Sequence, residues 1–300
     1  MFHTPRLAHV PSVDGWTHRL GRDSAGSVER APGGHRAPPT RLLALEPSRA
    51  GAELATFVAM LPLLELAPRG DGHPVVVLPG FMAGDLTTTA LRQYLRSLGY
   101  RVHRWGLGTN VGPTAEALAG CVDLLERAYN RDGRTVTIIG WSLGGIYARQ
   151  MARDAPELVR QVITLGSPFQ LARGSQTHAS WLFSRYSHLH VDPSSLPEPK
   201  AGRSWLPVPA TAIYSRTDGI VRWHTCLTAA GPDAENIQVR GSHCGLGHNV
   251  GALWAVADRL AQREGQWAPF RPGMGWRRLF PPATSWRPAV VPLEGFPEEP

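Results

Sequence analysis

The sequence has one lysine, three cysteines and no unbroken apolar stretch of the kind that a secretory signal needs. Because Lys200 is the only lysine, the net charge of +7 comes from arginines scattered along the 300 residues. No basic run with interleaved aromatic residues occurs, which argues against a nucleic-acid-binding surface. The charge therefore indicates an arginine-rich composition with a weak attraction to anionic surfaces.

Cysteine and glycine motifs for metals and nucleotides are also missing. Cys121, Cys226 and Cys244 are odd in number and widely spaced, without a Cys-x-x-Cys pair, so neither a metal site nor a Cys226–Cys244 disulfide has support. No phosphate loop is present, and Gly106-Leu107-Gly108 lacks the third glycine and the following helix of a dinucleotide fingerprint. We expect neither a metal nor a cofactor.

The N-terminal residues differ in composition from the rest. Residues 1–47 mix proline, glycine, arginine and histidine without apolar periodicity, which predicts a disordered extension and, with no recognisable signal peptide, a cytoplasmic protein. A helix is predicted from Ser48 to Leu64, with a kink at Pro62. With Glu53 inside it and Glu65 at its end, it is too charged and too short for a membrane span. We expect it to pack on the core, with attachment to a membrane surface as the alternative.

Apolar runs alternate with helical patterns in the middle of the chain. Strands are predicted near 75–78, 100–105, 135–139, 162–165, 210–214 and 236–239, and helices near 87–98, 114–129, 143–154 and 250–263. This alternation predicts an α/β domain over 48–266, with a mostly parallel sheet of about six strands covered on both faces. The proline- and tryptophan-rich tail, 267–300, has neither period and is expected to be extended.

The segment 136–149 is the most informative part of the sequence. It is typical of a buried strand, a tight turn with Ser142 and a helix. Gly140 and Gly144 would relieve crowding around the strained serine, and the helix start would point its free N–H groups at an oxyanion beside it. The segment therefore predicts a serine nucleophile.

A serine nucleophile needs a base and an orienting carboxylate, in the order serine, acid, histidine along an open parallel sheet. Asp218 follows the strand at 210–215, and His243 follows the strand at 236–239. His248, five residues further on, is the competing base, but it falls where a helix is predicted to start. We therefore favour His243.

Two further features concern the substrate. The strand at 75–78 ends in a glycine-rich loop, where Phe81, or else Met82, is expected to form an oxyanion hole with the Leu143 amide. The long connection 168–208 predicts a cap over the serine, with an acyl pocket formed by Trp181, Phe183 and Tyr186. The alternative is a crossover helix whose aromatic residues face the core.

On these residues, the chain resembles the α/β-hydrolases of the lipase and esterase type over roughly 70–264. The resemblance rests on the residues already described and on three short segments: Pro79-Gly80-Phe81, Leu165-Gly166-Ser167-Pro168-Phe169 and Gly241-Ser242-His243. It implies that Ser142 is the nucleophile, His243 the base and Asp218 the acid. Many relatives have His-Gly where this chain has Pro79-Gly80, so the hydrogen bonding of the oxyanion loop is expected to differ. A serine nucleophile also argues against the dehalogenase and epoxide-hydrolase branches, which use aspartate.

The expected function is hydrolysis of a small-molecule or lipid carboxylic ester through an acyl-serine intermediate. Acyl transfer to an alcohol by the same residues is the first alternative, since it differs only in whether water reaches the acyl-enzyme. A catalytically silent binding protein of the same fold is the second. Peripheral membrane contact is compatible with each.

Overall fold

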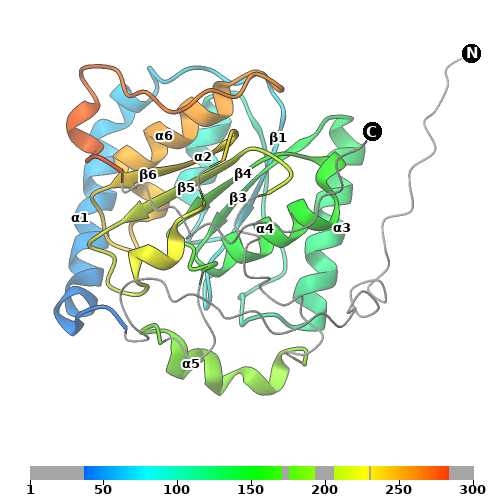
Figure 1. The fold of residues 1–300 in the computed structure, drawn as a ribbon, viewed down its shortest axis with the longest axis vertical. Helices are drawn as coiled ribbons and strands as arrows, with labels where there is room; N and C mark the ends of the chain where they lie inside the picture. The colour runs from blue at the N-terminus through cyan, green and yellow to red at the C-terminus, as the bar shows by residue number, and fades with distance from the viewer. Residues whose placement is uncertain (1–36, 171–175, 193–205, 230, 284–300) are drawn as a thin grey trace, which may run out of the picture.

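The computed structural model describes residues 37–170, 176–192, 206–229 and 231–283. Its centre is a six-stranded sheet in the order β2-β1-β3-β4-β5-β6, in which every neighbouring pair is parallel (Figure 1). The strands are β1 Pro74–Leu78, β2 Arg101–His103, β3 Val136–Trp141, β4 Val159–Leu165, β5 Ala210–Ser215 and β6 Ala234–Val239. The predicted fold class and strand number are confirmed.

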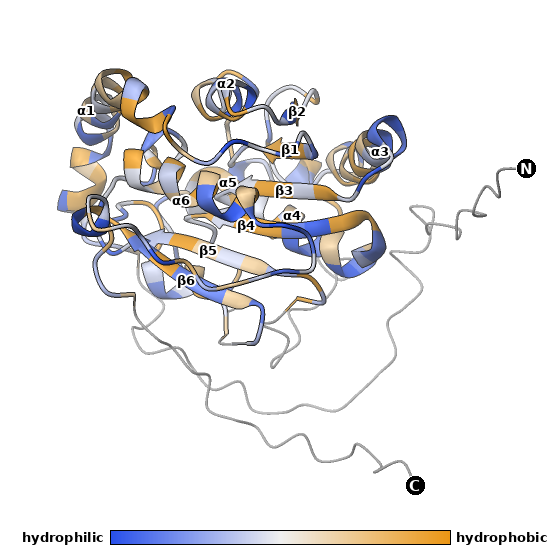
Figure 2. Ribbon diagram, turned by 90° about the horizontal axis from the view of Figure 1, so that it is seen from above, coloured by the Kyte–Doolittle hydropathy of each residue, from blue (hydrophilic) through white to orange (hydrophobic). Residues whose placement is uncertain are grey.

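Helices cover both faces of the sheet, as Figure 2 shows from above. They are α1 Thr40–Leu64, α2 Thr89–Ser97, α3 Ala115–Asp132, α4 Leu143–Asp154, the short α5 Ser180–Arg185 and α6 Val250–Ala261. In β1, Val75 and Val77 pack in a core with α1, α2 and α6, whereas Val76 and Leu78 pack in a second core with α3 and α4. Because both faces are buried, the strand sequence is continuously apolar.

Helix α1 begins at Thr40, eight residues before the predicted start at Ser48. The predicted boundary at residue 47 therefore falls inside α1, and residues 1–36 of the predicted extension lie outside the described residues. Pro47 lies inside this helix, and the structure continues the helix through it. Phe57 and Leu64 are buried in the core, so the predicted packing of this helix is confirmed.

Three other features bear on the sequence predictions. The described part of the tail packs against the α6 side of the core, where Trp276 stacks on Trp254 with ring centroids 3.9 Å apart. Among the described residues, no helix combines the length and apolar character that a membrane crossing requires. The three cysteines are free thiols.

Candidate active site

Ser142 lies on a sharp turn between β3 and α4. Its backbone is strained, with φ 52° and ψ −120°, a conformation that residues with a β-carbon rarely adopt. A β-carbon at Gly140 would collide with Gly145, and one at Gly144 would lie 2.5 Å from the carbonyl oxygen of Leu78. These two glycines let the strand, the helix and the neighbouring β1 loop approach closely enough to form the turn.

His243 joins Ser142 to Asp218. Its Nε2 lies 3.0 Å from Ser142 Oγ, and its Nδ1 lies 2.6 Å from Asp218 Oδ2. Both His243 and Asp218 are buried. The structure therefore brings together the three residues singled out in the sequence, at distances suited to proton transfer. His248 instead directs its Nε2 at the carbonyl oxygen of Ala50, 3.0 Å away.

Asp218 uses its two carboxylate oxygens differently. Oδ1 accepts hydrogen bonds from the amides of Ile220 and Val221, each at 2.8 Å, so the residue does stabilise the turn that an Asp-Gly pair suggests. Oδ2 is left for His243. The turn fixes the carboxylate, and the fixed carboxylate orients the imidazole.

The electrostatic surroundings favour the charged form of His243. Burial opposes the imidazolium, but the charge and hydrogen bond of Asp218, together with the charge of Glu46, outweigh it and raise the pKa of His243 above its ordinary value. A raised pKa makes the imidazole a stronger base. The neutral form of His243 therefore appears only at a higher pH than for an ordinary histidine.

Two backbone amides are placed for an oxyanion. Leu143 is the first residue of α4, where amides have no partner within the helix. The Phe81 amide makes no hydrogen bond within the described part of the chain, whereas the Met82 amide donates to the Asn110 carbonyl oxygen at 2.7 Å. A β-carbon on Gly80 would lie 3.0 Å from Ser142 Cβ, so this loop runs beside the serine. The geometry thus favours Phe81 over the alternative, Met82.

Asn110, which no sequence pattern indicated, holds the oxyanion loop in place. Its Nδ2 donates to the Pro79 carbonyl oxygen at 3.0 Å, and its backbone N–H donates to Ala83 at 2.8 Å. The residue is 1% exposed. Asn110 therefore holds the Pro79-Gly80 loop beside the serine. No local pattern marks it as a loop contact, because the loop residues that it binds, Pro79, Met82 and Ala83, lie almost thirty residues or more away along the chain.

The predicted cap aromatics divide into two groups. Phe183, on α5, packs on Phe81 with ring centroids 5.2 Å apart, and Tyr186 lies 6.2 Å from Phe81. Trp181 is 77% exposed, so its predicted place in an enclosed pocket is not supported. The reason is helical geometry: two residues apart on a helix, Trp181 and Phe183 face different sides. Parts of the predicted cap, 171–175 and 193–205, lie outside the described residues.

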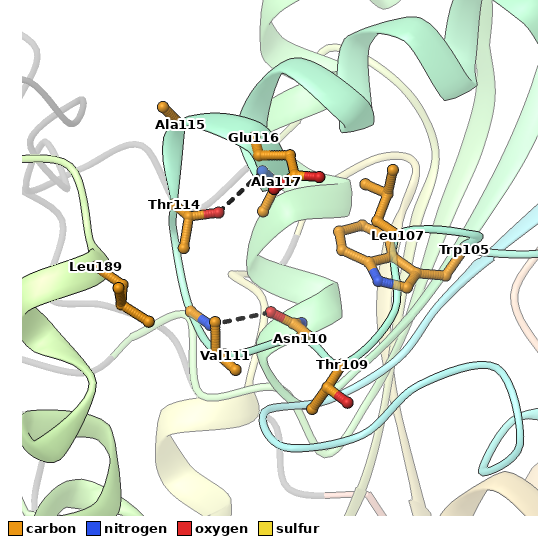
Figure 3. A pocket seen from close by; sticks show the side chains of 11 residues that line it. Trp105, Leu107, Thr109, Asn110, Val111, Thr114, Ala115, Glu116, Ala117 and Leu189 are labelled. Carbon is orange, nitrogen blue, oxygen red and sulfur yellow. Dashed lines mark hydrogen bonds between the residues drawn. The ribbon is translucent and has the colours of Figure 1, made fainter.

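A cavity of about 400 Å³ lies next to the oxyanion loop. Figure 3 shows Trp105, Leu107, Asn110 and Val111 on its walls, with Leu189 from the cap segment at its rim. None of Ser142, His243 and Asp218 lines it. Asn110 is shared between this cavity and the loop that runs beside the serine.

A parallel sheet with a serine on a strand-to-helix turn, followed in chain order by an aspartate and a histidine that reach it, is the α/β-hydrolase fold. The chain has the α/β-hydrolase fold. Lipase B of Aspergillus fumigatus, a solved structure of 16% sequence identity, matches with a TM-score of 0.52 over 66% of this chain and 54% of its own.

No family model matches the chain. Curated proteins match it in sequence, but only over part of their length. The chain is 35% identical over 123 residues to a pimeloyl-[acyl-carrier protein] methyl ester esterase of Shewanella sp. (strain MR-7), covering 40% of this chain and 44% of the relative. It is 33% identical over 102 residues to the esterase of the same name from Aliivibrio fischeri, covering 33% and 38%. The chain thus spans less than half the length of these curated relatives.

Proposed function

We propose that this protein hydrolyses carboxylic esters. Ser142 Oγ attacks the ester carbonyl while His243 Nε2 takes its proton, and the same proton then passes to the leaving alcohol. Asp218 stabilises the imidazolium, and the amides of Leu143 and Phe81 stabilise the oxyanion. Water, activated by His243, then releases the acid from the acyl-serine.

The observation that carries the proposal is the continuous hydrogen-bonded chain from Ser142 through His243 to Asp218. A binding protein has no need of a strained serine aligned with a buried imidazole and carboxylate. The printed activity of the relatives, hydrolysis of a methyl ester, supports the same reaction class. Their substrate is bound to a carrier protein, and we extend only the ester chemistry to this chain.

The test is a panel of p-nitrophenyl esters from acetate to palmitate, together with methyl esters of the same acids. Both the released alcohol and the acyl product should be quantified, with and without an added acceptor alcohol. Free acid as the main product supports hydrolysis, whereas a new ester with the acceptor supports acyl transfer. No turnover of any ester by the folded protein would contradict the proposal.

We further propose that Phe183 and Tyr186 contact the acyl chain. Phe183→Ala is expected to lower the turnover of long-chain relative to short-chain esters by about tenfold, because each buried methylene contributes about 0.8 kcal/mol. Trp181→Ala, on the same helix but exposed, is the matched control and should leave this ratio unchanged. Equal ratios for wild type and Phe183→Ala would place the ring outside the acyl site.

The outer face of α1 supports a second proposal, peripheral contact with a membrane. Leu54 and Val58, one turn apart on this helix, are 45% and 59% exposed, and no exposed charged side chain lies between Gly51 and Leu63. Such a face, on a chain of net charge +7, suits an anionic lipid surface.

Sedimentation with anionic phospholipid vesicles tests this contact. The double variant Leu54→Gln, Val58→Gln is expected to bind about tenfold more weakly, because full burial of an apolar side chain contributes about 1.5 kcal/mol or more and about half of each of these two is still exposed in the free protein. Leu86→Gln is the control, since Leu86 is 88% exposed elsewhere on the surface. Equal binding of both variants, or none by wild type, would refute membrane contact through α1.

A further inference from the structure

Glu46 of α1 is a buried carboxylate that binds two catalytic loops at once. It is 2% exposed. Its Oε1 accepts hydrogen bonds from the Gly219 amide at 2.8 Å and from the His243 amide at 2.9 Å, and its Oε2 accepts one from the Cys244 amide at 2.9 Å. Gly219 directly follows Asp218, so one side chain connects the backbone beside the acid to the backbone of the base.

Tight packing fixes α1 against the Asp218 loop. A β-carbon at Gly219 would lie 2.6 Å from the Leu42 carbonyl, so only glycine lets the helix backbone come this close. Three residues beyond Glu46, Arg49 donates to the Thr217 carbonyl oxygen at 2.7 Å and to Thr217 Oγ1 at 2.9 Å. The loop that carries Asp218 is thus held by α1 on both sides of the acid.

The His243 loop is held by the same helix. Two turns beyond Glu46, Glu53 Oε1 accepts from the Ser242 amide at 2.7 Å. A β-carbon at Gly245 would collide with the Glu53 carboxylate. Both loops therefore meet α1 through backbone amides and glycines, contacts that fix backbone position rather than side-chain packing.

The charge of Glu46 also acts on the imidazole. The groups around His243 that bear or could bear charge are Asp218, Glu46 and the Cys244 thiol. Glu53 of α1 binds the amide of the preceding loop residue, Ser242. Burial and the charge of Glu46 raise the pKa of Cys244 to about 12, so the thiol is neutral. Glu46 is therefore the second anion, after Asp218, that favours the imidazolium.

We propose that Glu46 is a positioning residue for the triad, which fixes the Asp218 and His243 loops relative to each other and stabilises the imidazolium through its charge. This rests on the proposed ester hydrolysis. A small displacement of a catalytic group lowers the reaction rate strongly, because the reacting atoms must be held in a near-attack geometry. The role belongs to α1, which precedes residues 70–264, the range on which the sequence resemblance to the hydrolases rests.

The test compares Glu46→Gln and Glu46→Asp with Glu65→Gln, an exposed control at the end of the same helix. Glu46→Gln is expected to lower kcat/KM by about tenfold to 100-fold, mainly through kcat. Because it removes a negative charge, the pKa of His243 should fall, and the acidic limb of the kcat/KM profile should move to lower pH. Glu46→Asp keeps the charge and should keep the limb near that of wild type.

NMR titration of His243 in the same variants provides a readout independent of turnover. If wild type hydrolyses no ester, the proposed function fails, yet a lower pKa of His243 in Glu46→Gln would still support the electrostatic part. If wild type is active, a folded Glu46→Gln with unchanged kcat/KM, or with a reduced kcat/KM and unmoved pKa, overturns the proposal. Melting temperatures show which variants are folded. If Glu46→Gln does not fold, Glu46→Asp takes its place in the comparison of kcat/KM with wild type.

Discussion

Replacing Ser142 with alanine is expected to lower kcat for ester hydrolysis by about 10⁴-fold or more. The alanine side chain cannot form the acyl intermediate, so only binding and the oxyanion amides remain to assist attack by water. The fold should persist, because among the described residues the Ser142 hydroxyl is bonded only to His243, and its removal leaves little unsatisfied. Initial rates with the best ester of the panel measure the loss.

Ser97→Ala is a suitable control for this variant. Ser97 is an exposed serine at the end of α2, away from the turn that carries Ser142. It should match wild type in rate and melting temperature. A Ser142→Ala protein that retains a tenth or more of the wild-type rate would show that another residue is the nucleophile.

Replacing His243 with alanine is expected to lower kcat by about 10⁴-fold, because the serine then loses its proton acceptor. His248→Ala should cost less than about tenfold in kcat, since its imidazole bonds to the Ala50 carbonyl and not to the serine. The two variants form a matched pair: the residues are five positions apart, and each makes an imidazole hydrogen bond.

The raised pKa of His243 adds a pH dependence to this comparison. Since the neutral imidazole is the base, kcat/KM in wild type should rise with pH through a pKa above the ordinary value of 6.5. His248→Ala should leave that midpoint in place. A larger loss of kcat in His248→Ala than in His243→Ala would reverse the assignment of the base.

The sequence predicted those residues of the site that directly follow the end of a strand. Ser142, Asp218 and His243 each follow an apolar run, and parallel strands end at the same edge of a sheet, so the order of residues along the chain indicated their meeting. Gly140 and Gly144 were recognisable because the turn requires them. The choice between His243 and His248 depended on the same reasoning, since only His243 directly follows a strand.

Contacts between distant side chains were not predictable in this way. Glu46 lies 173 residues from Gly219 and 197 from His243, and nothing in its local sequence marks it as buried. The helix start was also placed after it, at Ser48, whereas α1 begins at Thr40. Trp181 shows the converse error: aromatic content suggested a pocket, but which side a helical residue faces is set by packing.

The most direct test of the central claim is the reaction of the native protein with a fluorophosphonate, followed by peptide mapping by mass spectrometry. A triad that activates Ser142 predicts one phosphonyl adduct, on the peptide containing Ser142, which forms more slowly at a pH below the pKa of His243. An adduct on another residue, or none on the folded wild-type protein, would contradict it.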